Sequence, residues 1–177
     1  MSCGPDRRIA IILGFILLAG CGRGAGPVGD GPGPGEGAAG VDGPKDAADG
    51  RSRWERYEDS LRAAKSLAEF RDLLPTARWR RRMAEGDHEF TDENIGASET
   101  VLRKFLDDVA AAGGDAGRQR GAFEKAVKAF DRLNVEMNGF IETGEREDLG
   151  EFFNRVADLV GLKYADGDVT WEWRKEW

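Results

Sequence analysis

Cysteine and histidine are scarce in this sequence, whose 177 residues include two cysteines and one histidine. Two cysteines cannot build the disulfide framework of a small secreted scaffold, and one histidine excludes a histidine-rich metal site. Long apolar runs are lacking too, so a polytopic membrane protein is excluded. With 40% hydrophobic residues, 33% charged residues and a net charge of −7, the bulk of the chain has the composition of a soluble globular protein.

The first twenty residues have the layout of an export signal. Arg7 and Arg8 precede an apolar run over residues 9–19, and Gly20 and Cys21 follow it. The run has 11 residues, whereas a helix that spans the hydrocarbon core needs about 20. This order of charged, apolar and small residues predicts a cleaved signal peptide over residues 1–20.

Leu18, Ala19, Gly20 and Cys21 resemble the lipobox of bacterial lipoproteins, in which a branched apolar residue and two small residues precede a cysteine. The resemblance implies cleavage before Cys21, a diacylglycerol group on its thiol, and further acylation, for example with palmitate. Each buried methylene contributes about 0.8 kcal/mol, so two or three acyl chains would make a stable membrane anchor. The alternative is an ordinary signal peptide with a chance cysteine.

The implied location is outside the cytoplasm, with the lipid on Cys21 as the contact with the membrane. Gly22 stands where an Asp would resemble the inner-membrane retention signal of some Gram-negative lipoproteins. The outer membrane is therefore favoured if the cell has one.

Glycine and proline dominate the next segment. Residues 22–50 contain 11 Gly and 4 Pro among 29 positions and have no Ser or Thr. Such a composition cannot form a core. We therefore predict a disordered linker over residues 21–50, with a typical end-to-end distance of roughly 30 Å.

From residue 51 to residue 177, apolar side chains recur every three or four positions, which predicts amphipathic helices. The expected N-caps are Ser52, Ser66, Ser98, Asp115 and Thr143. A turn at Asp166 and Gly167 would precede a short last helix capped by Asp168. Short connections favour antiparallel neighbours, so the predicted fold is all-α, a small bundle of four to six helices without a sheet.

Two clusters could form an interaction surface. The first is an arginine-rich segment of five residues, and the second is a C-terminal group of three tryptophans: Arg78, Trp79, Arg80, Arg81 and Arg82; Trp171, Trp173 and Trp177. Each has a structural alternative, because arginines can pair with nearby acids and tryptophans can close the bundle. Helical spacing would place Trp173 and Trp177 on one face and Trp171 on another, which predicts that one tryptophan is exposed.

No pattern in the sequence predicts a catalytic set, a cofactor or a resident metal. His88 lies between Asp87 and Glu89, but adjacent side chains do not converge on one ion. The loop around Gly167 fails the EF-hand spacing, because Leu162, Tyr164 and Trp173 would occupy ligand positions. An acidic chain with one basic segment also argues against nucleic acid as a partner.

These features predict a lipid-anchored envelope protein whose helical domain, without catalysis, binds another protein or a cell-wall component. One alternative is a hydrolase of envelope material that uses Glu89 with Asp92 or Glu93, since a carboxylate pair needs no histidine. Another is an inhibitor or immunity-type binding protein. The sequence leaves the presence of enzymatic activity and the oligomeric state open.

Overall fold

The computed structural model describes residues 50–165 and 167–177. The predicted signal peptide, Cys21 and the predicted linker up to residue 49 lie outside this part of the chain, as does Asp166. The described residues form six helices and no strand, which confirms the all-α prediction. None of these helices is long and apolar enough to cross a membrane.

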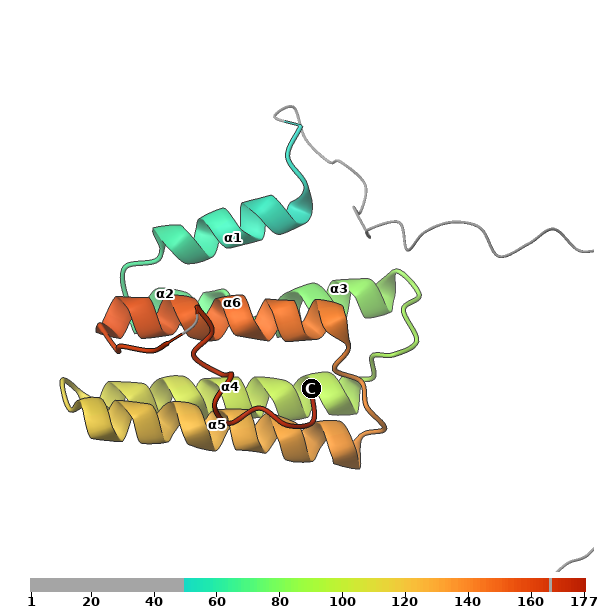
Figure 1. The fold of residues 1–177 in the computed structure, drawn as a ribbon. Helices are drawn as coiled ribbons and strands as arrows, with labels where there is room; N and C mark the ends of the chain where they lie inside the picture. The colour runs from blue at the N-terminus through green and yellow to red at the C-terminus, as the bar shows by residue number, and fades with distance from the viewer. Residues whose placement is uncertain (1–49, 166) are drawn as a thin grey trace, which may run out of the picture. The chain divides into compact units, whose positions relative to one another are not determined.

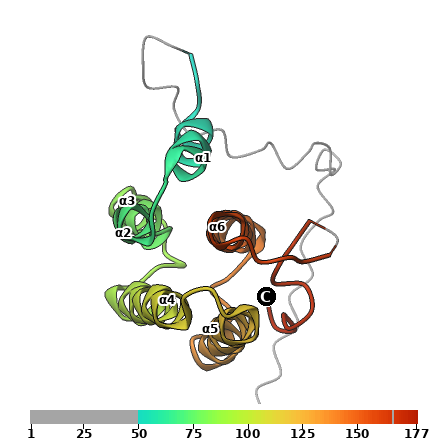
Figure 2. The same ribbon diagram turned by 90° about the vertical axis from the view of Figure 1, so that its left-hand side faces the viewer.

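Helices at four positions surround the core. The helices are α1 (Arg53–Ala63), α2 (Leu67–Asp72), α3 (Thr76–Ala84), α4 (Asp92–Ala112), α5 (Ala116–Glu136) and α6 (Thr143–Val160). The short helices α2 and α3 follow each other in line and share one position of the bundle (Figure 1). Together with α4, α5 and α6 they surround the core, and α1 lies outside this ring, against α6 (Figure 2).

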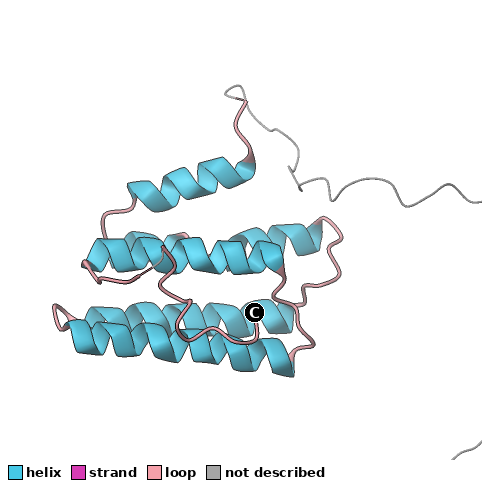
Figure 3. Cartoon of the chain, in the orientation of Figure 1, coloured by secondary structure: helices cyan, strands magenta, loops and turns pink. Residues whose placement is uncertain are grey.

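Most predicted helix starts are confirmed. Ser52 accepts a hydrogen bond from Glu55 N at 3.2 Å, and Ser66 accepts one from Glu69 N at 3.3 Å. The Asp115 carboxylate accepts one from Arg118 N at 2.9 Å and begins α5. Such caps satisfy N–H groups that have no partner within the helix, so they fix where each helix begins (Figure 3).

Two predicted caps are wrong. Helix α4 begins earlier than Ser98, because Thr91 Oγ1 accepts from Asn94 N at 3.1 Å while Asn94 Oδ1 accepts from Thr91 N at 2.9 Å. Ser98 is buried inside the helix and donates to Asn94 O at 2.8 Å. Helix α6 is capped by Glu142, whose N–H donates to Glu145 Oε2 at 3.0 Å, and Thr143 is its first residue.

The predicted last helix is also absent, since residues 169–173 form turns. Asp168 does act as a cap for these turns, because its Oδ1 accepts hydrogen bonds from Thr170 N at 2.8 Å and Thr170 Oγ1 at 2.6 Å. The segment after α6 therefore crosses the bundle as an irregular chain.

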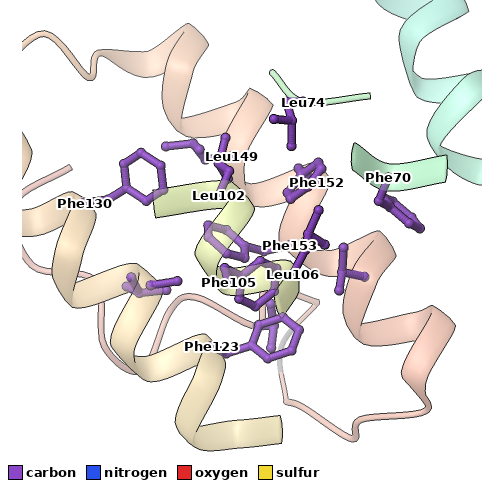
Figure 4. Close-up of a cluster of buried hydrophobic side chains, with 14 of the residues drawn as sticks. Phe70, Leu74, Leu102, Phe105, Leu106, Phe123, Phe130, Leu149, Phe152 and Phe153 are labelled. Carbon is purple, nitrogen blue, oxygen red and sulfur yellow. The ribbon is translucent and has the colours of Figure 1, made fainter. Parts of the chain in front are cut away.

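Phenylalanine side chains from three long helices meet in the centre of the bundle (Figure 4). Phe105 of α4 packs edge-on against Phe123 of α5 at 4.7 Å and against Phe153 of α6 at 4.8 Å between ring centroids. Edge-to-face pairs add to the free energy of burying the rings themselves. The α4, α5 and α6 faces predicted from periodicity thus form one core.

We expect Phe153→Ala to lower the free energy of unfolding by about 3–5 kcal/mol, because truncation of a buried Phe leaves a cavity. Val135→Ala is the control, since Val135 is 65% exposed and its truncation should change the free energy by less than about 0.5 kcal/mol. Urea unfolding followed by circular dichroism measures both. Equal effects of the two variants would contradict this description of the core.

Candidate functional site

The arginine-rich segment forms helix α3, and its tryptophan points inward. Trp79 is fully buried, stacks on Phe90 at 5.7 Å between ring centroids, and donates from Nε1 to Asp148 Oδ2 at 2.8 Å. The assignment of Trp79 to an interaction surface is therefore wrong. The physical reason is that α3 turns Thr76 and Trp79, three positions apart, toward the core.

The arginines of α3 mostly bind acids of other elements. Arg78 pairs with the buried Asp148 of α6, and its guanidinium lies 4.9 Å from the centroid of the Trp54 ring of α1. Arg80 pairs with Glu99 of α4 at 3.0 Å. Side chains of α3 thus connect this short helix to α1, α4 and α6.

Arg82 and Arg81 are neighbours in the sequence, but they differ in their ion pairs and in their exposure to solvent. Arg82 pairs with the buried Glu145 of α6 and, at 2.7 Å, with Asp87. Burial acts to lower the pKa of Arg82, but Glu145 and Asp87 act to raise it, and the pKa ends above its ordinary value. Arg81 is exposed and has no ion pair among the described residues, so it alone of the four remains available as a surface cation.

Asp148 is the most deeply buried acid of this network, with no exposed surface. Burial raises its pKa to about 6, because desolvation disfavours the carboxylate. Arg78 and the Trp79 hydrogen bond oppose this shift, and Glu145 adds to it. Burial and Asp148 also raise the pKa of Tyr57, whose hydroxyl donates to Leu73 O at 3.0 Å.

The three C-terminal tryptophans have different environments. Trp171 is 68% exposed, whereas Trp173 is buried with the Arg120 guanidinium 5.0 Å from its ring centroid. Trp177 packs on Phe130 at 6.1 Å between centroids, and its buried Nε1 has no hydrogen-bond partner among the described residues. Trp173 and Trp177 therefore pack on the bundle, and Trp171 alone presents most of its ring to solvent.

An open groove of about 410 Å³ lies between α1, α6 and the C-terminal segment; we call it the α1–α6 groove. Helix α6 contributes the residues Arg146, Glu147, Gly150, Glu151 and Asn154, whose spacing puts them on one side of the helix. Helix α1 contributes Trp54 and Glu58, and the C-terminal segment contributes Asp168 and Arg174.

Ion pairs fix much of the groove wall. Glu58 pairs with Arg62 at 3.0 Å, Glu151 with Arg155 at 2.7 Å, and Asp168 with Arg174 at 3.2 Å. Two lining residues, Arg146 and Glu147, have no ion pair among the residues that the structure describes. Charges of both signs thus remain available in the groove beside an indole ring.

The sequence analysis did not find this site. Trp54 has the same helical spacing as the buried Leu61 and Ala64, yet it lines the groove. The sequence feature that relates to the groove is the regular spacing of polar residues along α6. Any solvated helix face has such spacing, and only the packing of α1 beside it makes a groove.

A second cavity, of about 470 Å³, brings together some of the residues considered for catalysis. His88, Glu89 and Glu93 line it with Glu136 of α5, whereas Asp92 lies toward Arg80 at 3.7 Å. Glu89 and Glu93 are both exposed, so their carboxyl groups lack the unequal environments that distinguish the acid from the base in a glycosidase. No group of three His, Cys, Asp or Glu residues among those described could hold a metal ion.

Comparison of the chain with models of protein families, with curated proteins and with solved structures found no match. The function is therefore argued from the residues and their geometry.

We expect Arg82→Ala to lower the free energy of unfolding by about 1–3 kcal/mol, because it leaves the buried Glu145 without its cation. Arg81→Ala is the matched control and should change this free energy by less than about 0.5 kcal/mol. Urea unfolding at pH 7 distinguishes them, and an Arg81→Ala effect as large as that of Arg82→Ala would refute the pairing described above.

Asp148 should make the protein less stable as the pH rises. A carboxyl group whose pKa is higher in the folded than in the unfolded state holds its proton more tightly in the folded state, so its contribution falls between the two pKa values. With a pKa of about 6 against 3.8, the loss between pH 4 and pH 7 amounts to about 2 kcal/mol.

Asp148→Asn removes this titration and keeps an oxygen that can accept from Trp79. The unfolding free energy of the original protein minus that of Asp148→Asn should therefore decrease from pH 4 to pH 7, because other titrations cancel in the difference. Urea unfolding across this range measures it. If the difference in unfolding free energy stayed constant or increased with pH, the raised pKa of Asp148 would be contradicted.

Proposed function

We propose that this protein is a lipid-anchored component of the bacterial envelope whose helical domain binds other envelope molecules, without catalysis, in the α1–α6 groove. The observation that carries the proposal is the groove itself. It combines a half-buried tryptophan, an arginine and a glutamate without ion pairs, and a wall fixed by three ion pairs. Small-molecule sites are concave surfaces of about 300–1,000 Å³ with a few well-placed polar groups.

The sequence before the domain supports the anchored part of the proposal. Cys21 stands at the end of a lipobox-like segment, and 29 residues rich in Gly and Pro separate it from residue 51. A chain of this length and composition allows a separation of roughly 30 Å between anchor and domain. The domain would then reach material that lies within this distance of the membrane.

The ion-paired carboxylates of the groove favour binding over hydrolysis. Glu58, Glu151 and Asp168 each pair with an arginine. A carboxylate that pairs with an arginine is held in one orientation, and it can offer a ligand only hydrogen-bond acceptors. Such groups serve better as fixed hydrogen-bond acceptors.

The anchor is tested with the two cysteines of the chain. Cys21→Ala should abolish the incorporation of labelled palmitate and the cleavage before residue 21, because the acceptor thiol is missing. Cys3→Ala is the matched control and should be labelled and processed normally. Mass spectrometry of the N-terminus and lipid labelling in cells read out both, and a labelled Cys21→Ala protein would refute lipidation at this residue.

The binding site is tested by photo-crosslinking in intact cells. Benzoylphenylalanine in place of Glu58, in the groove, should give a covalent adduct with an envelope molecule on irradiation. In place of the exposed Lys125 of α5, outside the groove, it should give none. The absence of an adduct at position 58, or equal adducts at both positions, would count against the groove as the binding site.

A further inference from the structure

We infer that the α1–α6 groove binds a chain of N-acetylated amino sugars through their uncharged hydroxyl and acetamide groups, which the glycan strands of the cell wall carry. This inference rests on the proposed function and specifies the class of ligand.

The charges around the groove disfavour a ligand with a strong net charge. Three carboxylates and one arginine that line the groove are already in ion pairs: Glu58, Glu151 and Asp168, and Arg174. An anion would still meet the carboxylate of Glu147, and a cation would meet the guanidinium of Arg146, which have no ion pair among the described residues. Like charges at close range raise the free energy of binding, so a neutral polar ligand fits best.

The unpaired groups suit a ligand that both donates and accepts hydrogen bonds. The Arg146 guanidinium can only donate, and the Glu147 carboxylate can only accept. Sugar hydroxyl and acetamide groups offer both partners without a charge. Since hydrogen bonds to charged groups are worth more than those between neutral groups, this pair would orient a sugar ring.

Trp54 supplies the apolar part of such a site. Its ring lines the groove and is held by Tyr57, at 5.7 Å between ring centroids, and by the Arg78 guanidinium. One face of a pyranose ring carries mainly C–H groups, which pack on an aromatic ring and leave the hydroxyl groups at the edge for polar partners. An indole beside a donor and an acceptor therefore matches a sugar.

The opposite wall is fixed before any ligand arrives. Asn154 Nδ2 donates to Gly167 O at 2.9 Å, and Asn154 Oδ1 accepts from Val169 N at 2.9 Å. These bonds hold the C-terminal segment against α6 (Figure 2), where Asp168 pairs with Arg174. A site that is already ordered loses less conformational entropy on binding.

The test uses the mature lipidated protein in detergent and the uncharged tetramer of N-acetylglucosamine as the probe, with isothermal titration calorimetry as the measurement. We expect the tetramer to bind, and we expect Trp54→Ala and Glu147→Ala each to weaken binding at least fivefold. Trp171→Ala is the matched tryptophan control, since Trp171 is exposed but does not line the groove, and it should bind as the original protein does.

Circular dichroism confirms that each variant is folded, and Glu147→Ala keeps the test decisive if Trp54→Ala is unstable. Absence of tetramer binding, or binding that depends on Trp171 and not on Trp54 and Glu147, would overturn the inference. If a lysine-rich peptide or an acidic polysaccharide bound in place of the tetramer, the sugar assignment would be wrong. A crosslink at position 58 would then still support the proposed function, whereas absence of that crosslink would reject the proposed function itself.

Discussion

The arrangement of α1 and α3 against α6 depends on the contacts of one buried group, the carboxylate of Asp148. It lies on α6, accepts a hydrogen bond from Trp79 and pairs with Arg78, both on α3. A carboxylate without these partners would be costly to bury, so α3 must sit where its tryptophan and arginine reach α6. Asp148 thus binds two side chains of the nine-residue helix α3, and the pair of Arg82 with Glu145 adds a second contact between α3 and α6.

The groove is a consequence of the same contact. Arg78 pairs with Asp148 and also lies against Trp54, so it links α6 to α1 through α3. Tyr57 adds a hydrogen bond to Leu73, just before α3. Helix α1 is therefore held beside the polar face of α6, and the space between the two helices becomes a groove with a rigid wall.

The sequence predicts those parts of the fold that depend on local pattern. Periodic apolar residues and the caps Ser52, Ser66 and Asp115 place the helices α1, α2 and α5, because capping and amphipathicity act over a few residues. The start of α4 was missed because Thr91 and Asn94 precede the apolar stripe and Ser98 is a more familiar cap residue. The periodic pattern alone cannot distinguish a cap from a buried serine.

The candidate site depends on contacts between residues far apart in the chain, and these have no local signal. Trp79 has arginines on both sides, so its burial is visible only once Asp148, 69 positions later, is placed beside it. Trp54 has the spacing of a core residue and nevertheless lines the groove, because α1 covers only part of α6. The proposed anchor, in contrast, is predicted from consecutive residues that end at Cys21.

The most direct test of the groove as a binding surface is amide hydrogen exchange of the mature protein with and without purified cell-wall sacculi. The account predicts slower exchange in residues 53–63 and 143–154, which form the two helical walls, and unchanged exchange across α4 and α5. Slower exchange confined to other segments, or no change anywhere, would contradict it.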